Sequence, residues 1–208
     1  MPADDALIER IAGRLLRAPE PVGDKDLAPD WLPDDPFDRP PVPAAVLIAL
    51  VRREAGLSVL YTERSTSLRR HSGQISFPGG RIDPGDNGPG DAALREAQEE
   101  VALDPAEARI LGYMPKYFTG TNYLITPVVG LVEPTHPFVP NPGEVTTVFE
   151  VPLSWIADEA SYGTFHVRRG DVDHTTWQLD HAGLRIWGIT ANLTRRFRDL
   201  ALGGEHEW

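Results

Sequence analysis

The sequence contains no cysteine among its 208 residues. This absence excludes disulfide bonds, thiolate metal sites and a cysteine nucleophile. The sequence also lacks an apolar run of the roughly 20 residues that a helix needs to cross a bilayer. Its first ten residues, MPADDALIER, include aspartates where a signal peptide would carry basic residues. We therefore expect a cytoplasmic protein with no membrane partner.

Basic residues are also scarce. The chain has 20 lysines and arginines against 31 aspartates and glutamates, which gives a formal net charge of −11. Nucleic-acid phosphates need a basic footprint, so we expect no nucleic-acid partner. If the substrate is a small anion, a local basic patch or a metal ion must overcome the overall negative field.

A segment dense in proline and aspartate divides the chain. Before it, residues 4–17 have the apolar periodicity of an amphipathic helix. The segment itself, at 18–43, suits neither a regular helix nor a central strand, because proline lacks the backbone donor that both require. We predict two parts: an N-terminal helix and proline-rich extended segment at 1–43, and one domain at 44–208.

Most segments of the predicted domain have the length and composition of β-strands. The apolar run at 44–51 is followed, after a turn at Gly56, by a hairpin partner at 57–64. Later strand-like runs lie at 109–114, 123–132, 144–153, 164–169, 175–180 and 183–188. Helical patterns lie at 91–103 and from 189 to about 202. This order predicts an α+β fold with helices packed on a mixed sheet.

The helical segment DAALREAQEEVAL, residues 91–103, carries a cluster of negative charge. Glu96, Glu99 and Glu100 share one face, because positions three and four apart are neighbours on a helix. Like charges at this spacing destabilise a helix by roughly 0.2–0.5 kcal/mol per pair. The cluster is either a solvated face partly relieved by Arg95 or a site for a cation, and the helix alone does not decide between these interpretations.

The loop before this helix, GQISFPGGRIDPGD, contains a glycine turn. Gly79 and Gly80 after Pro78 mark a place where the backbone approaches another group closely. The turn, Asp86 and the acidic helix bring a backbone carbonyl and several carboxylates within reach of one site. Hard cations such as Mg²⁺ and Mn²⁺ prefer oxygen ligands and complete their shell with water and phosphate. Zinc is disfavoured because the cluster has neither histidine nor cysteine.

The stretch at 80–103 resembles the Nudix box, in which a glycine and an acid precede the pattern Arg-Glu, two residues, Glu-Glu, one residue, Gly and an aliphatic residue. The sequence departs from the box at four points. Asp86 replaces glutamate, and eight residues rather than seven separate it from Arg95. Ala97 replaces a bulky aliphatic residue, and Ala102 replaces the glycine. The resemblance implies that the metal site is retained, and it leaves the role of Asp86 open.

A second motif precedes the box. Residues 60–80, LYTERSTSLRRHSGQISFPGG, are similar to the signature of the coenzyme A pyrophosphatases within the Nudix superfamily, with Tyr61 as the visible substitution. The likeness extends from about Ala44 to Ala191. It implies a Nudix-type α/β/α sandwich with a mixed β-sheet, a catalytic helix after a glycine loop, and a C-terminal helix.

The resemblance implies a hydrolase that cleaves the pyrophosphate bond of coenzyme A or its derivatives to 3′,5′-ADP and 4′-phosphopantetheine or its acyl form. The implied cofactor is Mg²⁺ or Mn²⁺, and its ligands are Glu96, Glu99, Glu100 and the carbonyl of Gly79. The expected partner is a small-molecule substrate of the coenzyme A class, and a homodimer is left open. The alternatives are a Nudix hydrolase of ADP-ribose, a dinucleoside polyphosphate or another nucleoside diphosphate derivative, and a catalytically silent Nudix-fold binding module.

The catalytic residues that the resemblance implies are Glu96, Glu99, Glu100, Arg95 and Glu144. Arg95 is first interpreted as the ion-pair partner of a carboxylate, which would fix the rotamers of the ligands, and second as a direct substrate contact. Glu144, in the loop NPGEV, is the downstream acid best placed to act as a general base or an additional metal ligand. An ordinary solvated glutamate is the alternative.

The substrate-binding candidates are Arg64, Arg69, Arg70, His71 and Gly80. The first four form the densest basic patch of the chain. The patch either balances the charge of the acidic helix or captures the 3′-phosphate or diphosphate of coenzyme A, since arginine suits bidentate phosphate contacts. Aromatic side chains that could stack on adenine or line a pantetheine channel are Tyr117, Phe118 and Tyr123, with core packing as the alternative for at least one of them.

Overall fold

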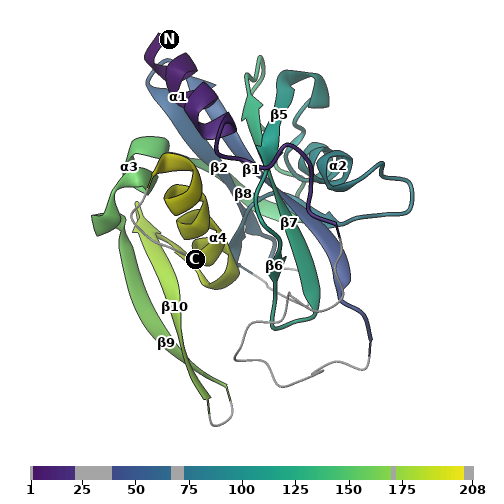
Figure 1. Cartoon of the computed structure of the whole chain (residues 1–208), viewed down its shortest axis with the longest axis vertical. Helices are drawn as coiled ribbons and strands as arrows, with labels where there is room; N and C mark the ends of the chain where they lie inside the picture. The colour runs from purple at the N-terminus through teal and green to yellow at the C-terminus, as the bar shows by residue number, and fades with distance from the viewer. Residues whose placement is uncertain (1, 22–38, 67–72, 170–171, 204–208) are drawn as a thin grey trace.

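The structure is a computed structural model and describes residues 2–21, 39–66, 73–169 and 172–203 (Figure 1). Its helices are α1 (Pro2–Ala12), α2 (Pro89–Val101), α3 (Leu153–Ala157) and α4 (Gly188–Phe197), with short turns of helix at η1 (Pro105–Glu107), η2 (Glu159–Ser161) and η3 (Arg198–Leu202). Its strands are β1 (Val42–Arg53), β2 (Gly56–Arg64), β3 (Ile75–Ser76), β4 (Gly79–Arg81), β5 (Ala108–Tyr113), β6 (Tyr117–Phe118), β7 (Tyr123–Val132), β8 (Val145–Pro152), β9 (Tyr162–Arg169), β10 (Val172–His181) and β11 (Leu184–Trp187). Each strand-like run of the sequence overlaps one of these strands, and both helices predicted for the domain are present.

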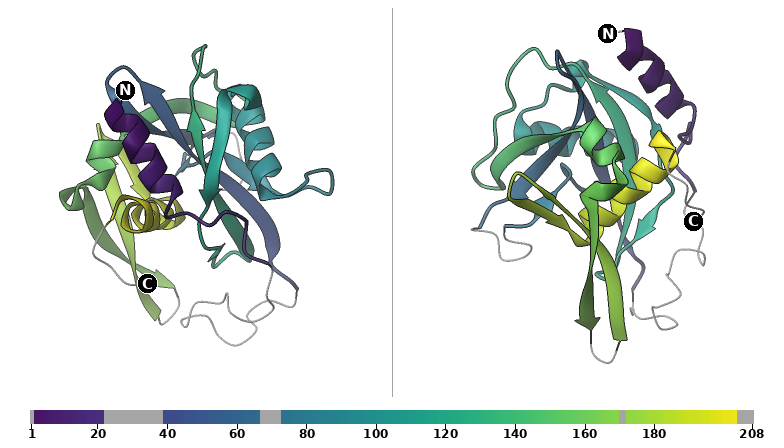
Figure 2. Two further views of the ribbon diagram at one scale, coloured as in Figure 1. Left: turned by 45° about the horizontal axis from the view of Figure 1, so that its top comes forward. Right: turned by 90° about the vertical axis from the view of Figure 1, so that its left-hand side faces the viewer.

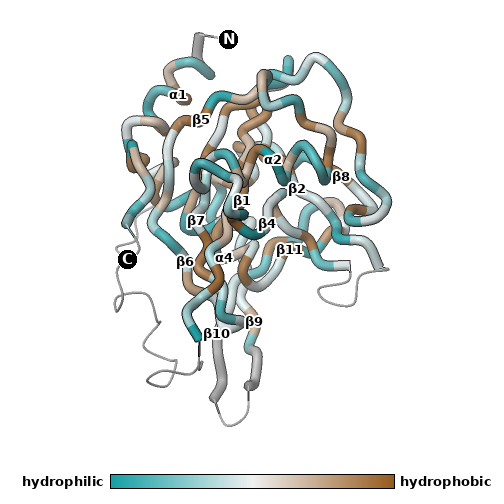
Figure 3. The backbone as a smooth tube through the Cα atoms, turned by 90° about the vertical axis from the view of Figure 1, so that its right-hand side faces the viewer, coloured by the Kyte–Doolittle hydropathy of each residue, from teal (hydrophilic) through white to brown (hydrophobic). Residues whose placement is uncertain are grey.

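The main sheet is mixed, as predicted. Its order is β3-β2-β1-β7-β5, while β4, β6 and β8 pair with β1, β7 and β2, respectively. Strand β1 runs parallel to β7 and antiparallel to β2. The sequence of β1, VPAAVLIALVRR, is almost continuously apolar and buried, which is typical of a strand covered on both faces. Hydrophobic stretches of the chain accordingly run along the central strands (Figure 3).

Alternate residues of β1 face two different layers of helices, because side chains alternate across a strand. The layer formed by α2 packs on the odd-numbered residues Ala45, Leu47, Ala49 and Val51. The layer formed by α1 and α4 packs on the even-numbered residues Ile48 and Leu50, through Ile8, Ile11, Leu193 and Phe197. The result is the predicted α/β/α sandwich, with α2 on one side of the sheet and α1 and α4 on the other (Figure 1).

The late strands form a second sheet, which the sequence did not predict. It has the antiparallel order β11-β10-β9, and β9 and β10 extend as a long hairpin away from the main sheet (Figure 2). Arg195 of α4 fastens this sheet to the domain, since its guanidinium lies 5.0 Å from the ring centroid of Tyr162 and 4.3 Å from that of Trp177. The same side chain pairs with Asp199 at 3.0 Å and Glu159 at 2.8 Å.

The end of the first helix differs from the prediction. The first helix ends at Ala12 rather than near residue 17, because Leu16 leaves it to pair with Tyr113 of β5 through two backbone hydrogen bonds of 2.9 Å. The last helix changes at Arg198 into a π-helical turn that ends at Leu202, where the sequence predicts the end of the helical segment. Among the described residues, no helix is both long enough and apolar enough to cross a membrane.

Candidate functional site

Small side chains position helix α2. Ala92, Ala93 and Ala97 are fully buried against β1, and alanine at position 97 allows a closer approach to the sheet than a bulky aliphatic residue would. Pro89 begins the helix, where its missing N–H has no helical partner to lose. Ala102 ends it with φ of 56°, the left-handed conformation that glycine adopts most readily. Two of the departures from the box are thus accommodated locally.

Arg95 is the centre of an ion-pair network. It binds Asp86 in a bidentate manner, with Nε 3.0 Å from Oδ1 and Nη2 3.1 Å from Oδ2. Its Nη1 donates to Glu96 Oε1 at 2.9 Å and lies 3.4 Å from both carboxylate oxygens of Glu99. Its Nη2 also donates to the carbonyl of Arg81 at 3.0 Å. Hydrogen bonding from Arg95 lowers the pKa of Asp86, so this aspartate stays charged and anchors the guanidinium.

Glu100 is held in an unfavourable environment. Its side chain is only 2% exposed, and Arg64 Nη1 lies 3.6 Å from its Oε1. Its other oxygen, Oε2, is buried without a hydrogen-bond partner among the described residues. Burial, followed by the charges of Glu96 and Glu144, raises the pKa of Glu100 from 4.5 to about 8, against the opposing effects of Arg64 and of a hydrogen bond from the backbone of Gly79. A buried carboxylate oxygen that lacks a partner is a natural ligand for a cation.

These groups meet in a cleft of about 300 Å³. Its lining includes the carboxylates of Glu96, Glu100 and Glu144, the guanidinium of Arg64, and both glycines of the turn, Gly79 and Gly80. Glu144 comes from the loop before β8 and lines the cleft beside the acidic residues of α2, where its charge raises the pKa of both Glu96 and Glu100. The oxygen-only donor set and the unpartnered Oε2 of Glu100 fit a hard divalent cation.

The remaining predicted residues are placed differently. Glu99 is half exposed and does not line the cleft. In the described part of the chain, no three aspartate, glutamate or histidine side chains are arranged to hold a metal ion by themselves. Fewer side chains suffice for Mg²⁺, which keeps several waters and binds phosphate oxygens. Arg69, Arg70 and His71 lie outside the described residues.

One basic residue of the cleft was not predicted from the sequence. Arg81 of β4 lines it together with Tyr123, one of the three aromatic candidates. The signal was its position two residues after Gly79, which puts both on the same face of a strand. Tyr117 is packed against α4, where Asn192 Nδ2 donates to its hydroxyl at 3.0 Å and Arg196 lies 5.3 Å from its ring centroid.

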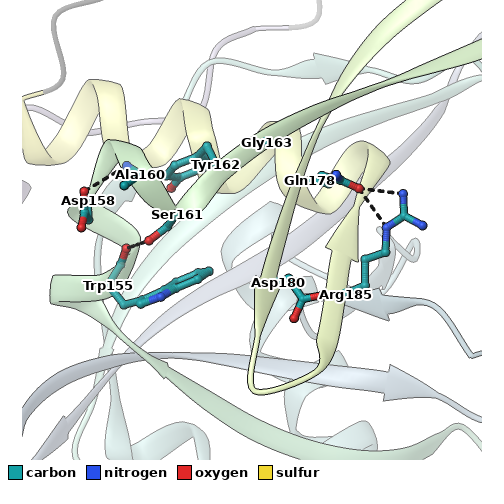
Figure 4. Close-up of a pocket in the computed structure, with 9 residues that line it drawn as sticks. All are labelled: Trp155, Asp158, Ala160, Ser161, Tyr162, Gly163, Gln178, Asp180 and Arg185. Atoms are coloured by element: carbon teal, nitrogen blue, oxygen red, sulfur yellow. Dashed lines mark hydrogen bonds between the residues drawn. The ribbon is translucent and has the colours of Figure 1, made fainter.

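A larger hollow of about 520 Å³ lies between α3 and the second sheet (Figure 4). Trp155, Asp158, Asp180 and Arg185 are among its lining residues, and Gln178 accepts two hydrogen bonds from Arg185. Of the residues predicted for the site, none that the structure describes lines this hollow. The smaller cleft, which holds the acidic cluster, is therefore the candidate for chemistry.

Comparison with known proteins gives the family. The model of the NUDIX domain matches residues 41–168. NudL of Escherichia fergusonii, described as an uncharacterized Nudix hydrolase, is 43% identical over 161 residues, which are 76% of this chain and 81% of that protein. The crystal structure of RenU, a Nudix hydrolase from M. smegmatis, has a TM-score of 0.48 and 21% identity, and the match covers 57% of this chain and 75% of that chain. DR0079 from Deinococcus radiodurans has a TM-score of 0.49 and 19% identity, with coverage of 84% and 89%.

The family-model match and the identity to NudL show that the chain belongs to the Nudix family. Its fold is the Nudix fold. Nudix hydrolases generally use divalent metal ions, and this chain is a Nudix pyrophosphohydrolase that acts on a nucleoside diphosphate derivative.

Replacement of each glycine of the turn by alanine should have a different effect: one substitution should reduce stability and the other should reduce activity. A Cβ at Gly79 would overlap backbone atoms of β1 and lie 2.7 Å from the Cα of Val46, so Gly79→Ala should lower the free energy of unfolding by about 1–3 kcal/mol. The atoms nearest to a Cβ at Gly80 would be those of the Glu96 carboxylate, with 2.5 Å to its Cδ. Because that side chain can rotate away, Gly80→Ala should keep its stability and lose activity. Urea denaturation and hydrolysis rates test this contrast, and equal destabilisation of both variants would contradict it.

The raised pKa of Glu100 predicts how stability depends on pH when metal is removed. A carboxyl with a higher pKa in the folded state stabilises the fold while it is protonated, and this contribution is lost as pH rises through about 8. With a chelator present, the free energy of unfolding of the wild type should therefore fall from about pH 5 to above pH 8, relative to that of Glu100→Gln. Urea denaturation across this range measures the difference, and parallel pH profiles would rule out the effect.

Proposed function

We propose that the chain hydrolyses the pyrophosphate bond of coenzyme A or its derivatives and releases 3′,5′-ADP and 4′-phosphopantetheine or its acyl form. The observation that carries this proposal is where the motif at 60–80 lies in the fold. Arg64 from the start of the motif, at the end of β2, and Gly79 and Gly80 from its end, in β4, line the cleft beside Glu96 and Glu100. The segment whose sequence resembles the coenzyme A pyrophosphatases thus meets the metal-binding candidates.

The carboxylates of α2 and the carbonyl of Gly79 are proposed to hold Mg²⁺ or Mn²⁺, which supplies charge neutralisation for the diphosphate oxygens. The proposed ligands are Glu96, Glu99, Glu100 and Gly79. Arg95 is the positioning residue of this group, because its contacts with Asp86 and Glu96 fix the direction of the carboxylate that faces Gly80. Hydrolysis itself needs positioning, charge stabilisation and an oriented water more than covalent chemistry by the protein.

Glu144 is the proposed general base. Its carboxylate comes from a loop separate from α2 and reaches the same cleft, so a base and a ligand set can be provided by different elements. In this role Glu144 accepts a proton from the attacking water as the new phosphorus–oxygen bond forms and the bridging oxygen leaves. Arg64 remains close to Glu100 and is proposed to contact a substrate phosphate, with Arg69, Arg70 and His71 as further candidates. A cytoplasmic location and a homodimer also remain predictions.

A substrate panel tests the proposed activity. Coenzyme A, acyl-coenzyme A, ADP-ribose and diadenosine tetraphosphate are each incubated with Mg²⁺ or Mn²⁺, and the products are resolved by chromatography. We expect hydrolysis of coenzyme A or its acyl form to exceed that of the other substrates, with 3′,5′-ADP as one product. Glu99→Gln is the matched inactive control and should lower kcat by about 100-fold or more. Preferred hydrolysis of ADP-ribose or diadenosine tetraphosphate would reject the coenzyme A assignment, and no hydrolysis of any substrate would favour a silent binding module.

Glu144→Gln tests the general base. The substitution keeps the size of the side chain and removes its basicity, so kcat should fall by about 10²-fold or more while KM changes little. The acidic limb of the pH–rate profile should flatten, because the group that must lose its proton is gone. An unchanged kcat and acidic limb would remove Glu144 from the mechanism.

A further inference from the structure

A guanidinium and a phenol ring line the cleft next to the acidic residues and have no role in the chemistry described above. Arg81 Nη2 donates to the hydroxyl of Tyr123 at 3.2 Å, and the guanidinium carbon lies 5.8 Å from the centroid of the ring. Both side chains line the same cleft as Glu96 and Glu100. We call this pair the Arg81–Tyr123 ledge.

Strand register places the ledge on one face of the sheet. Ala44 of β1 pairs with Arg81 of β4 on one side and with Ile125 of β7 on the other, so these side chains share a face. Tyr123, two residues before Ile125, lies on that face too. Gly80 has the opposite orientation, since a Cβ there would point at the carboxylate of Glu96. The glycine turn therefore separates the ledge from the carboxylates of α2.

The ledge is also fixed in position. The backbone carbonyl of Arg81 accepts a hydrogen bond from Arg95 Nη2 at 3.0 Å, which ties β4 to the ion-pair network of α2. The side chain of Arg81 in turn restrains the ring of Tyr123 through the hydroxyl. Because the ring and the guanidinium of the ledge are already ordered, they lose less conformational entropy when a ligand binds.

The charge of Arg81 is available for a ligand. In the described part of the chain Arg81 forms no ion pair, whereas Arg64 lies beside Glu100 and Arg95 is surrounded by acidic oxygens. An exposed guanidinium suits a phosphate oxygen, and an aromatic face suits a flat nucleobase. A flexible pantetheine chain has no flat ring to stack on Tyr123. It also has no phosphate, other than that of the diphosphate, to bind Arg81.

We propose that the Arg81–Tyr123 ledge is the subsite for the nucleotide half of the substrate, with the base stacked on Tyr123 and a phosphate of the same nucleotide bound by Arg81. The inference rests on the proposed function only in that the substrate contains a nucleotide. It adds Arg81 to the residues that determine specificity, and it orients the substrate so that the diphosphate crosses the glycine turn to reach the carboxylates.

Equilibrium binding tests the ledge without turnover. Isothermal titration calorimetry with 3′,5′-ADP, 5′-AMP, adenosine and 4′-phosphopantetheine is carried out on the wild type and on Arg81→Ala, Tyr123→Ala and Tyr123→Phe. Arg81→Ala should raise the Kd of 3′,5′-ADP about tenfold or more and change that of adenosine little. Tyr123→Ala should weaken all three adenine ligands about tenfold, while Tyr123→Phe, which keeps the ring, should bind them nearly as the wild type does. A loss for 5′-AMP as large as that for 3′,5′-ADP assigns Arg81 to the 5′-phosphate, and a smaller one assigns it to the 3′-phosphate.

Arg185→Ala is the matched control, because Arg185 also lies over an aromatic ring, that of Phe165 at 4.9 Å, but belongs to the second sheet. It should leave every Kd unchanged. Unchanged binding of 3′,5′-ADP in both Arg81→Ala and Tyr123→Ala would overturn the proposal, as would an equal loss for 4′-phosphopantetheine or no binding of 3′,5′-ADP to the wild type. If the wild type fails to hydrolyse coenzyme A but shows the expected binding pattern, the proposed substrate is wrong and the nucleotide subsite stands.

Discussion

Repulsion among carboxylates is the constraint on which the arrangement of the site depends. The separation of Glu96 and Glu100 by four residues on one helix costs only roughly 0.2–0.5 kcal/mol at an exposed surface, but burial of Glu100 makes its charge far more costly. Solvent-exposed ion pairs contribute about 0.2–1 kcal/mol each, so the contacts of Arg95 with Glu96 and Glu99 are enough to offset the repulsion on the exposed side. On the buried side Arg64 is a weaker partner at 3.6 Å. It does not compensate fully for the cost of burying the Glu100 carboxylate, so the pKa of Glu100 is raised. The carboxylate with the least compensated burial, that of Glu100, therefore lies where a cation would bind.

The departures from the Nudix box are consistent with this constraint. Asp86 has a shorter side chain than the glutamate of the box, and one additional residue lies between it and Arg95. It nevertheless binds the guanidinium through both oxygens, and the backbone N–H of Asp83 donates to one of them at 2.8 Å. Ala102 accepts a left-handed conformation that costs a non-glycine residue roughly 1–2 kcal/mol. The N–H groups of Ala102 and Leu103 satisfy the carbonyls at the helix end, which offsets part of that cost.

Local sequence patterns predicted most elements of the fold but not how all of them assemble. The strands at 44–51 and 123–132 were recognisable because apolar runs of that length are local signals. The separation of the late strands into a second sheet was not, since it depends on Arg195 meeting Tyr162 and Trp177, which are far from it in the chain. The end of α1 depends likewise on a pairing between Leu16 and Tyr113.

The same limit applies to the site. Helical spacing predicted that Glu96, Glu99 and Glu100 share a face, and the structure keeps them on one helix. Which of them is buried depends on how the alanines of α2 turn the helix against β1, so the contrast between exposed Glu99 and buried Glu100 could not be predicted from spacing alone. The pair Arg81 and Tyr123 required the register of three strands, β4, β1 and β7, before it could be recognised.

The distribution of positive charge has a consequence for substrate choice. The chain carries a net charge of −11, so an anionic substrate is attracted only where positive charge is locally in excess. In the proposed arrangement one source is the cation held by the carboxylates of α2 together with Arg64 beside Glu100, and the other is Arg81 on the opposite face of the sheet edge. Only the glycine turn, which carries no side chains, lies between the two sources of positive charge. A ligand that satisfies both must place a diphosphate and a nucleotide on either side of this turn, which favours an extended diphosphate diester over a compact nucleotide whose phosphates all lie at one end.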